Sequence, residues 1–196
     1  MEQTDSIHIL EKLIAFPTVS RQSNLDLVSY VAGLLDAHGI ASRIIHSEDG
    51  QKANLFATVG PDDAPGVMLS GHTDVVPVDG QDWAVPPFEM TERDGRLYGR
   101  GATDMKGFVA TALAAMIKAS GMKLLTPLQL ALSYDEEIGC IGVRSLIDML
   151  REAPRKPLLC IVGEPTEMQV ATGHKGKIGA RAFCRGIAPD EIRRRS

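Results

Sequence analysis

The sequence contains few cysteines and no long apolar run, and both absences narrow the classes of protein to consider. Its three cysteines, Cys140, Cys160 and Cys184, lie far apart without paired spacing, so they support neither a disulfide framework nor a cysteine-based zinc site. We expect these thiols to be reduced and buried. No window approaches the roughly 18 apolar residues of a membrane-spanning helix, and the N-terminus has no basic region followed by an apolar stretch. These features predict a cytoplasmic protein.

A strong charge of either sign is also absent. The formal net charge is −4, and the one basic run is formed by Arg193, Arg194 and Arg195 at the end of the chain. Nothing in the sequence as a whole attracts nucleic acid, so we expect a small-molecule partner, with no nucleic acid and no membrane. The content of 44% hydrophobic and 23% charged residues is typical of a globular domain with a core.

Two segments near the N-terminus have helical periodicity. Thr4 or Asp5 can cap the first helix, which has to end at Pro17, and Gly39 is suited to end the second. The apolar stripes are Ile7, Leu10, Leu13 and Ile14 in the first helix, and Leu25, Val28, Val31, Leu34 and Leu35 in the second.

Short apolar segments separated by turn-forming residues predict strands. Residues 128–134 and 158–162 are continuous apolar runs, which favour strands covered on both faces. Strands that alternate with helices predict an α/β layered sheet. The expected strands are 41–45, 54–59, 67–70, 128–134 and 158–162, with one or two more in 169–183. The expected helices are 105–120, largely buried, and 143–150. Residues 80–101 are a long loop with one hairpin near Asp94, and 186–196 have no pattern.

Polar clusters follow several of the predicted strands, at the edge where α/β sheets present ligands. After the strand at 67–70 come His72 and, two residues later, Asp74. His72 is either a metal ligand or a structural histidine, and Asp74 can hold its second ring nitrogen. Asp104, flanked by glycines before a buried helix, is either a ligand or the cap of that helix.

Carboxylates also follow the two buried strands. Asp135, Glu136 and Glu137 come after one strand and Glu164 after the other. A charge run is usually a solvated surface, but acids packed together at a strand end repel one another unless a cation or a shared proton relieves them. One histidine with several carboxylates suits zinc, cobalt or manganese.

Together these motifs resemble those of a family of two-metal amidohydrolases and peptidases. The family includes acetylornithine deacetylase, succinyl-diaminopimelate desuccinylase, aminoacylase and glutamate carboxypeptidases. Within it, the segments Pro77–Trp83, Pro87-Phe88, Asp94–Gly107 and Gly173–Gly176 are most similar to the acetylornithine deacetylases. The four family motifs are His72-Thr73-Asp74-Val75-Val76-Pro77, Tyr98–Gly107, Asp135-Glu136-Glu137 and Gly163-Glu164-Pro165-Thr166.

The resemblance implies a role for each site residue. His72 and Glu164 bind the first metal, Glu137 binds the second, and Asp104 bridges both. Glu136 is the general base and Asp74 orients His72. The resemblance also implies a cis peptide bond at Asp104-Met105 and two divalent metal ions, zinc or cobalt.

The resemblance further implies a three-layer α/β sheet of the zinc-peptidase type, with the catalytic domain incomplete and the lid domain nearly absent. In the family the catalytic domain resumes after the lid and supplies a final histidine to the second metal, which this sequence lacks. The expected domains are 1–173, the N-terminal part of the catalytic domain; 174–185, the start of the lid; and 186–196, a divergent tail that resembles an altered reading frame or premature stop.

Two functions follow from the resemblance. The first is hydrolysis of an N-acyl amino acid, with N-acetylornithine as the leading substrate. The second is an inactive, truncated metal-binding remnant of such a deacetylase. A structural α/β domain whose acids are only caps and surface charge would need four motifs to coincide. Arg100, Lys106 and Lys175 are candidates to meet a substrate carboxylate, or else are ordinary cations. Full-length relatives often form a homodimer through the lid.

Overall fold

The computed structural model describes residues 5–176, 178, 180 and 182–185. The chain divides into two compact units, Met1–Pro165 and Thr166–Ser196. In the second unit, the described residues contain a turn in which the backbone N–H of Gln169 donates to the carbonyl of Thr166, and no helix or strand. The predicted tail, 186–196, lies outside the described residues. Over the described residues, no helix is both long and apolar enough to cross a membrane.

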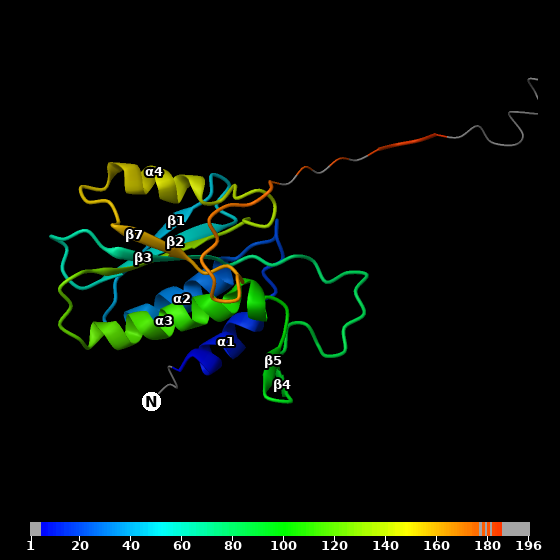
Figure 1. The fold of residues 1–196 in the computed structure, drawn as a ribbon, viewed down its shortest axis with the longest axis horizontal. Coiled ribbons are helices and arrows are strands. Elements are labelled where there is room, and N and C mark those ends of the chain that lie inside the picture. Colours follow the sequence, from blue (N-terminus) through cyan, green and yellow to red (C-terminus); the bar gives the residue numbers. More distant parts are fainter. Residues whose placement is uncertain (1–4, 177, 179, 181, 186–196) are drawn as a thin grey trace, which may run out of the picture. The chain divides into compact units, whose positions relative to one another are not determined.

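A five-stranded mixed sheet forms the centre of the first unit (Figure 1). Its order is β1-β2-β6-β3-β7, with β3 parallel to both β6 and β7 and the pairs β1–β2 and β2–β6 antiparallel. The carboxyl ends of β6, β3 and β7 therefore meet at one edge of the sheet. The strands are β1 (Ser42–His46), β2 (Ala53–Val59), β3 (Val67–His72), β6 (Leu128–Ser133) and β7 (Leu159–Val162).

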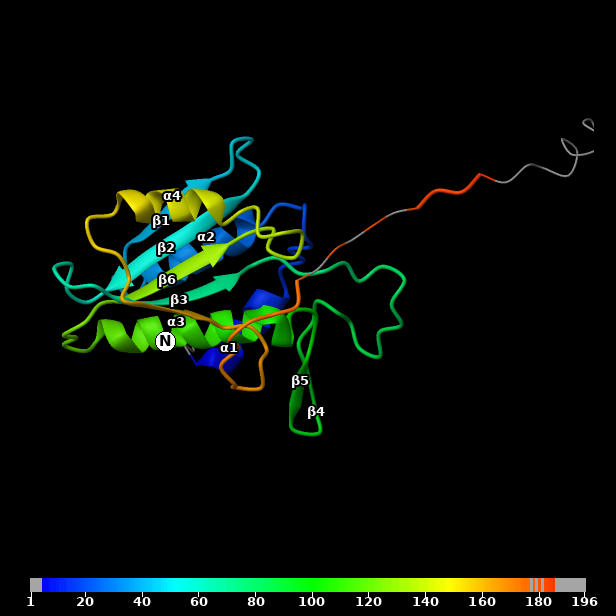
Figure 2. The ribbon, with the colours of Figure 1, turned by 45° about the horizontal axis from the view of Figure 1, so that its top comes forward.

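Helices cover both faces of this sheet, which confirms the predicted three-layer α/β fold (Figure 2). On one face, Leu13, Val31 and Leu113 of three helices join Leu55 and Leu130 of the sheet in the main core. On the other face, a single helix packs Leu146 against Met68 and Ala131. The first three helices are α1 (Ser6–Ile14), α2 (Leu25–Asp36) and α3 (Gly107–Ser120), and the fourth is α4 (Arg144–Glu152).

Local sequence accounts for the start of α1 and for the small hairpin. The carboxylate of Asp5 accepts a hydrogen bond of 2.9 Å from the backbone N–H of His8, as expected of a helix N-cap. The hairpin of β4 (Thr91–Arg93) and β5 (Arg96–Tyr98) turns at Asp94 and Gly95, which have φ of 53° and 68°. The prediction of the buried stripe of α1 was partly wrong, because Ile7 is exposed and Ile9 is buried.

Three expectations about burial and strands are wrong. All three cysteines are exposed, because Cys140 lies in a surface loop, Cys160 in β7 and Cys184 in the irregular second unit. The run at 158–162 is not covered on both faces, because every residue of β7 is exposed, Leu159 by 54%. No strand forms among the described residues of 169–183.

Candidate metal centre

His72, the last residue of β3, lies at the centre of the candidate site and is 2% exposed. Its Nδ1 lies 2.8 Å from the backbone oxygen of Asp74, and its Nε2 lies 3.0 Å from Oδ1 of Asp104. A proton on Nδ1 donates to that carbonyl and leaves Nε2 facing the carboxylates. The nearest side-chain oxygen of Asp74 is 3.5 Å from Nδ1, so the backbone oxygen makes the shorter contact to the ring.

The carboxylate of Asp74 connects the end of β3 to the loop after β6. It accepts the backbone N–H of Glu136 at 3.0 Å and of Glu137 at 3.3 Å, and the hydroxyl of Ser20 at 2.8 Å. Burial alone would raise the pKa of Asp74, but the adjacent imidazole of His72 and the hydrogen bonds from Glu136 and Ser20 outweigh burial and lower the pKa. Asp74 therefore sets the positions of two successive glutamates.

Four carboxylates surround Nε2 of His72. Asp104 lies in the turn Ala102–Lys106 before α3, and the Asp104-Met105 peptide bond is cis, as the resemblance implied. The oxygens of Glu136 and Glu164 lie 3.9 Å and 3.8 Å from Nε2. Two sets of ligand atoms each lie within 4.8 Å of one another: His72 with Glu136 and Glu164, and His72 with Asp104 and Glu137.

The charges of this cluster fit a bound cation. Burial and the negative charge of Asp104 raise the pKa of Glu137, and burial, Asp104 and Glu136 raise the pKa of Glu164. Burial alone would lower the pKa of His72, but Asp74 and Glu164 outweigh it and raise the pKa to about 9. A divalent cation relieves such crowding of carboxylates. The imidazole and carboxylate donors suit a metal such as zinc.

Asp135 and Lys106, which were singled out in the sequence, are not part of this cluster. Asp135 turns to the buried ammonium of Lys52 and also accepts the backbone N–H of Arg21 at 2.9 Å. Lys106 is fully buried and donates to the carbonyls of Leu13 and Phe16, at 3.0 Å and 2.7 Å, and burial lowers its pKa to about 7, so its role is structural. Lys175 belongs to the second unit.

Sequence reasoning missed the segment 18–24, which contacts the backbone and side chains next to His72, at Thr73 and Val75. Thr18 donates to the carbonyl of Thr73 at 2.5 Å, and Asn24 donates to the hydroxyl of Thr73 at 2.9 Å. An isolated parallel bridge pairs Val19 with Val75. The only signal in the sequence was a run of polar residues after Pro17, which is equally typical of a surface loop.

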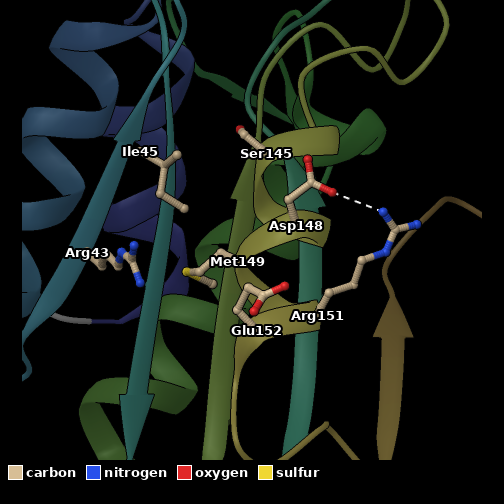
Figure 3. A pocket seen from close by; sticks show the side chains of 7 residues that line it. All are labelled: Arg43, Ile45, Ser145, Asp148, Met149, Arg151 and Glu152. Atoms are coloured by element: carbon tan, nitrogen blue, oxygen red, sulfur yellow. Dashed lines mark hydrogen bonds and ion pairs between the residues drawn. The ribbon is translucent and has the colours of Figure 1, made fainter.

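A cavity of about 490 Å³ lies between β1 and α4, away from His72 in the sheet (Figure 3). Its charged side chains come from both elements, and Arg151 pairs with Asp148 within α4 at 3.0 Å. Both partners of this pair are more than two-thirds exposed, and exposed pairs of this kind contribute little. None of the residues of the two ligand sets lines this cavity. We therefore place the functional site at the ends of β3, β6 and β7.

Comparison with known proteins gives consistent results. Residues 68–186 match the family model described as peptidase family M20/M25/M40. An acetylornithine deacetylase from Pasteurella multocida (strain Pm70) is 37% identical over 180 residues, which cover 88% of this chain and 46% of that protein. An acetylornithine deacetylase from Vibrio campbellii (strain ATCC BAA-1116) is 34% identical, over 91% of this chain and 47% of that protein. The chain therefore spans about half the length of these relatives.

Solved structures share the fold. An M20 family metallo-carboxypeptidase from Sulfolobus solfataricus superposes with a TM-score of 0.70 at 22% identity, over 83% of this chain and 37% of that chain. Human carnosine dipeptidase 1 superposes with a TM-score of 0.69 at 23% identity, over 80% of this chain and 38% of that chain. At this level of identity the likeness concerns the fold alone.

Proposed function

This chain belongs to peptidase family M20/M25/M40, and we propose that it is the metal-binding part of an amide hydrolase that acts on N-acyl amino acids. The observation that carries the proposal is the convergence of His72, Asp104, Glu136, Glu137 and Glu164 from three adjacent strand ends and one turn. The relatives named acetylornithine deacetylase support N-acetylornithine as the substrate. Its products are ornithine and acetate, and we assign the reaction to arginine biosynthesis in the cytoplasm.

We assign the metal ligands as the family resemblance implies. His72 and Glu164 would hold one divalent ion, Glu137 would hold a second, and Asp104 would serve both. Zinc and cobalt both suit these donors. When bound, such ions polarise the amide carbonyl and make the attacking water more acidic.

The remaining chemistry belongs to side chains of this chain. Glu136 accepts a proton from the attacking water as the new C–O bond forms, and donates it to the amine as the C–N bond breaks. Asp74 keeps Glu136 in place through its backbone N–H. Residues 1–173 form the catalytic part in this proposal, and 174–185 begin the lid domain.

Hydrolysis of N-acetylornithine by the zinc-loaded chain tests the proposal. Glu136→Gln keeps the shape of the side chain but removes the base, so we expect release of ornithine to fall by at least about 100-fold while the zinc content stays unchanged. Glu152→Gln, an exposed change on α4, is the matched control and should retain full activity. Equal activity of Glu136→Gln and the unaltered chain would contradict the assignment.

Metal binding without hydrolysis is the alternative function. It is favoured by one observation, that His72 is the only histidine in either ligand set among the described residues. The same assay separates the two functions, because this alternative predicts bound zinc and no release of ornithine from the unaltered chain.

A further inference from the structure

Lys52 and Asp135 form a buried ion pair directly before the two glutamates of the candidate site. The ammonium of Lys52 contacts a carboxylate oxygen of Asp135, and the two residues are 9% and 5% exposed. Asp135 immediately precedes Glu136 and Glu137 in the chain. Replacement of a buried ion pair by apolar side chains of similar volume is often neutral or stabilising. Stability alone is therefore a weak explanation for two buried charges at this place.

Asp135 fixes the backbone at the point where the chain leaves β6 and enters the site. Its second carboxylate oxygen accepts the backbone N–H of Arg21 at 2.9 Å, so this one side chain connects three segments that are distant in the sequence. Asp135 has a φ of 52°, in the left-handed region that residues other than glycine rarely adopt. Such a conformation persists only where the surrounding structure enforces it. The contacts with Lys52 and Arg21 supply that enforcement.

The backbone that carries Lys52 is itself fixed from two sides. Its N–H donates to the hydroxyl of Ser47 at 3.0 Å, and its carbonyl accepts the backbone N–H of Ser47 at 2.8 Å. The next residue, Ala53, exchanges two hydrogen bonds with the side chain of Asn24, at 2.8 Å and 2.9 Å. Asn24 also donates to the hydroxyl of Thr73, the residue that follows β3. The position of Lys52 is therefore connected to the end of β3 at the site.

The two glutamates are thus anchored from two directions. Asp74 accepts the backbone N–H groups of Glu136 and Glu137, and the Lys52–Asp135 pair fixes the residue before them. Asp74 follows β3, whereas Lys52 lies in the turn between β1 and β2, so the anchors come from different parts of the sheet. Both carboxylate oxygens of Asp135 are engaged, and Asp135 belongs to neither ligand set among the described residues.

We propose that Lys52, through Asp135, is a positioning residue that places Glu136 for proton transfer and Glu137 for metal binding. The inference rests on the proposed function, which gives these two glutamates their roles. Lys52 touches neither metal nor substrate and acts through the backbone of the loop after β6. Metal sites tolerate only small changes in the distances to their ligands. Loss of the pair therefore lowers the zinc affinity of the folded chain, which a purely stabilising role leaves unchanged.

Zinc titration against a competing chelator tests the inference. Lys52→Met keeps the length of the side chain but removes its charge, and we expect zinc affinity to fall by about tenfold or more. Lys52→Arg keeps the charge and should restore most of the affinity. Lys118→Met, at an exposed position in the last turn of α3, is the matched control and should bind zinc as the unaltered chain does. The visible absorption spectrum of the cobalt-loaded chain should change in Lys52→Met and stay the same in the control.

A double variant separates positioning from folding. Lys52→Met alone leaves the charge of Asp135 buried without its partner, which is destabilising. Adding Asp135→Asn removes the second charge, and asparagine tolerates a positive φ and keeps an oxygen for the N–H of Arg21. We expect the double variant to fold, as judged by circular dichroism, and still to bind zinc about tenfold more weakly than the unaltered chain. If neither variant folds, the pair serves stability and the inference is overturned.

The outcomes separate this inference from the proposed function. Unchanged zinc affinity in the folded Lys52→Met and double variants overturns the positioning role and leaves the hydrolase standing. Loss of affinity in both variants, when the zinc-loaded unaltered chain releases no ornithine from N-acetylornithine, overturns the hydrolase and leaves the placement of the loop standing. Failure of the unaltered chain to bind zinc overturns both.

Discussion

Asp74 receives three hydrogen bonds in a position that is 3% exposed, from Ser20 and from the backbones of Glu136 and Glu137. This single carboxylate determines where the loop after β6 passes the end of β3. Its influence on a metal would be indirect, through the ligands that it orients. Residues that orient metal ligands without touching the metal, here called outer partners, strongly affect metal affinity.

Asp74→Asn tests that role. The amide retains one acceptor oxygen but presents N–H groups to the N–H donors of the loop, so we expect a loss of about 1–3 kcal/mol in unfolding free energy. Zinc affinity should fall by about tenfold to a hundredfold. Urea denaturation and chelator competition measure the two effects. Asp62→Asn, at an exposed position, is the control, and zinc affinity equal to the control would argue against the role.

The sequence revealed the residue types of the site but not their partners. Asp135 stands beside Glu136 and Glu137 in the sequence, yet it has a φ of 52° and turns to Lys52, 83 positions away. Lys106 was a candidate to meet a substrate carboxylate or else an ordinary cation, and the structure buries it against the end of α1. Both contacts depend on how distant segments meet, which local patterns do not encode.

At the level of elements, the ends of β3 and β6 were predictable because apolar runs stop where polar motifs begin. The order of the strands was not predictable, and it decides which strand is covered. β7 has the composition of a central strand, but it lies at the edge of the sheet. An apolar, unpaired edge promotes association between chains.

Leu159→Lys should therefore reduce self-association of the purified chain. Leu159 is 54% exposed, so the substitution removes exposed apolar surface and adds a charge to the edge without disturbing the core. Sedimentation at increasing protein concentration measures the effect. Leu125→Lys is the matched control, because Leu125 is 86% exposed and lies in a loop. If both substitutions change association equally, the edge of β7 is not responsible.

At the scale of the whole molecule, parallel strands bring separate motifs to one place. His72 ends β3, Glu136 and Glu137 follow β6, and Glu164 follows β7, and β3 lies between the other two strands. The carboxyl ends of parallel neighbours share an edge, so motifs placed after predicted strands pointed to one edge of the sheet, and the strand order, which the sequence did not predict, brings these residues together. The position of Arg100 depends on the path of a long irregular loop, and for that reason the sequence left its role open.

The central claim is that the ends of these strands form a divalent-metal site around His72. Zinc titration with a competing chelator, on the unaltered chain and on His72→Ala, tests it most directly. We expect the variant to lose more than the roughly hundredfold in affinity that removal of an outer partner costs. His46→Ala, at an exposed position in β1, should bind zinc as the unaltered chain does. Zinc binding by His72→Ala with unchanged affinity would contradict the account.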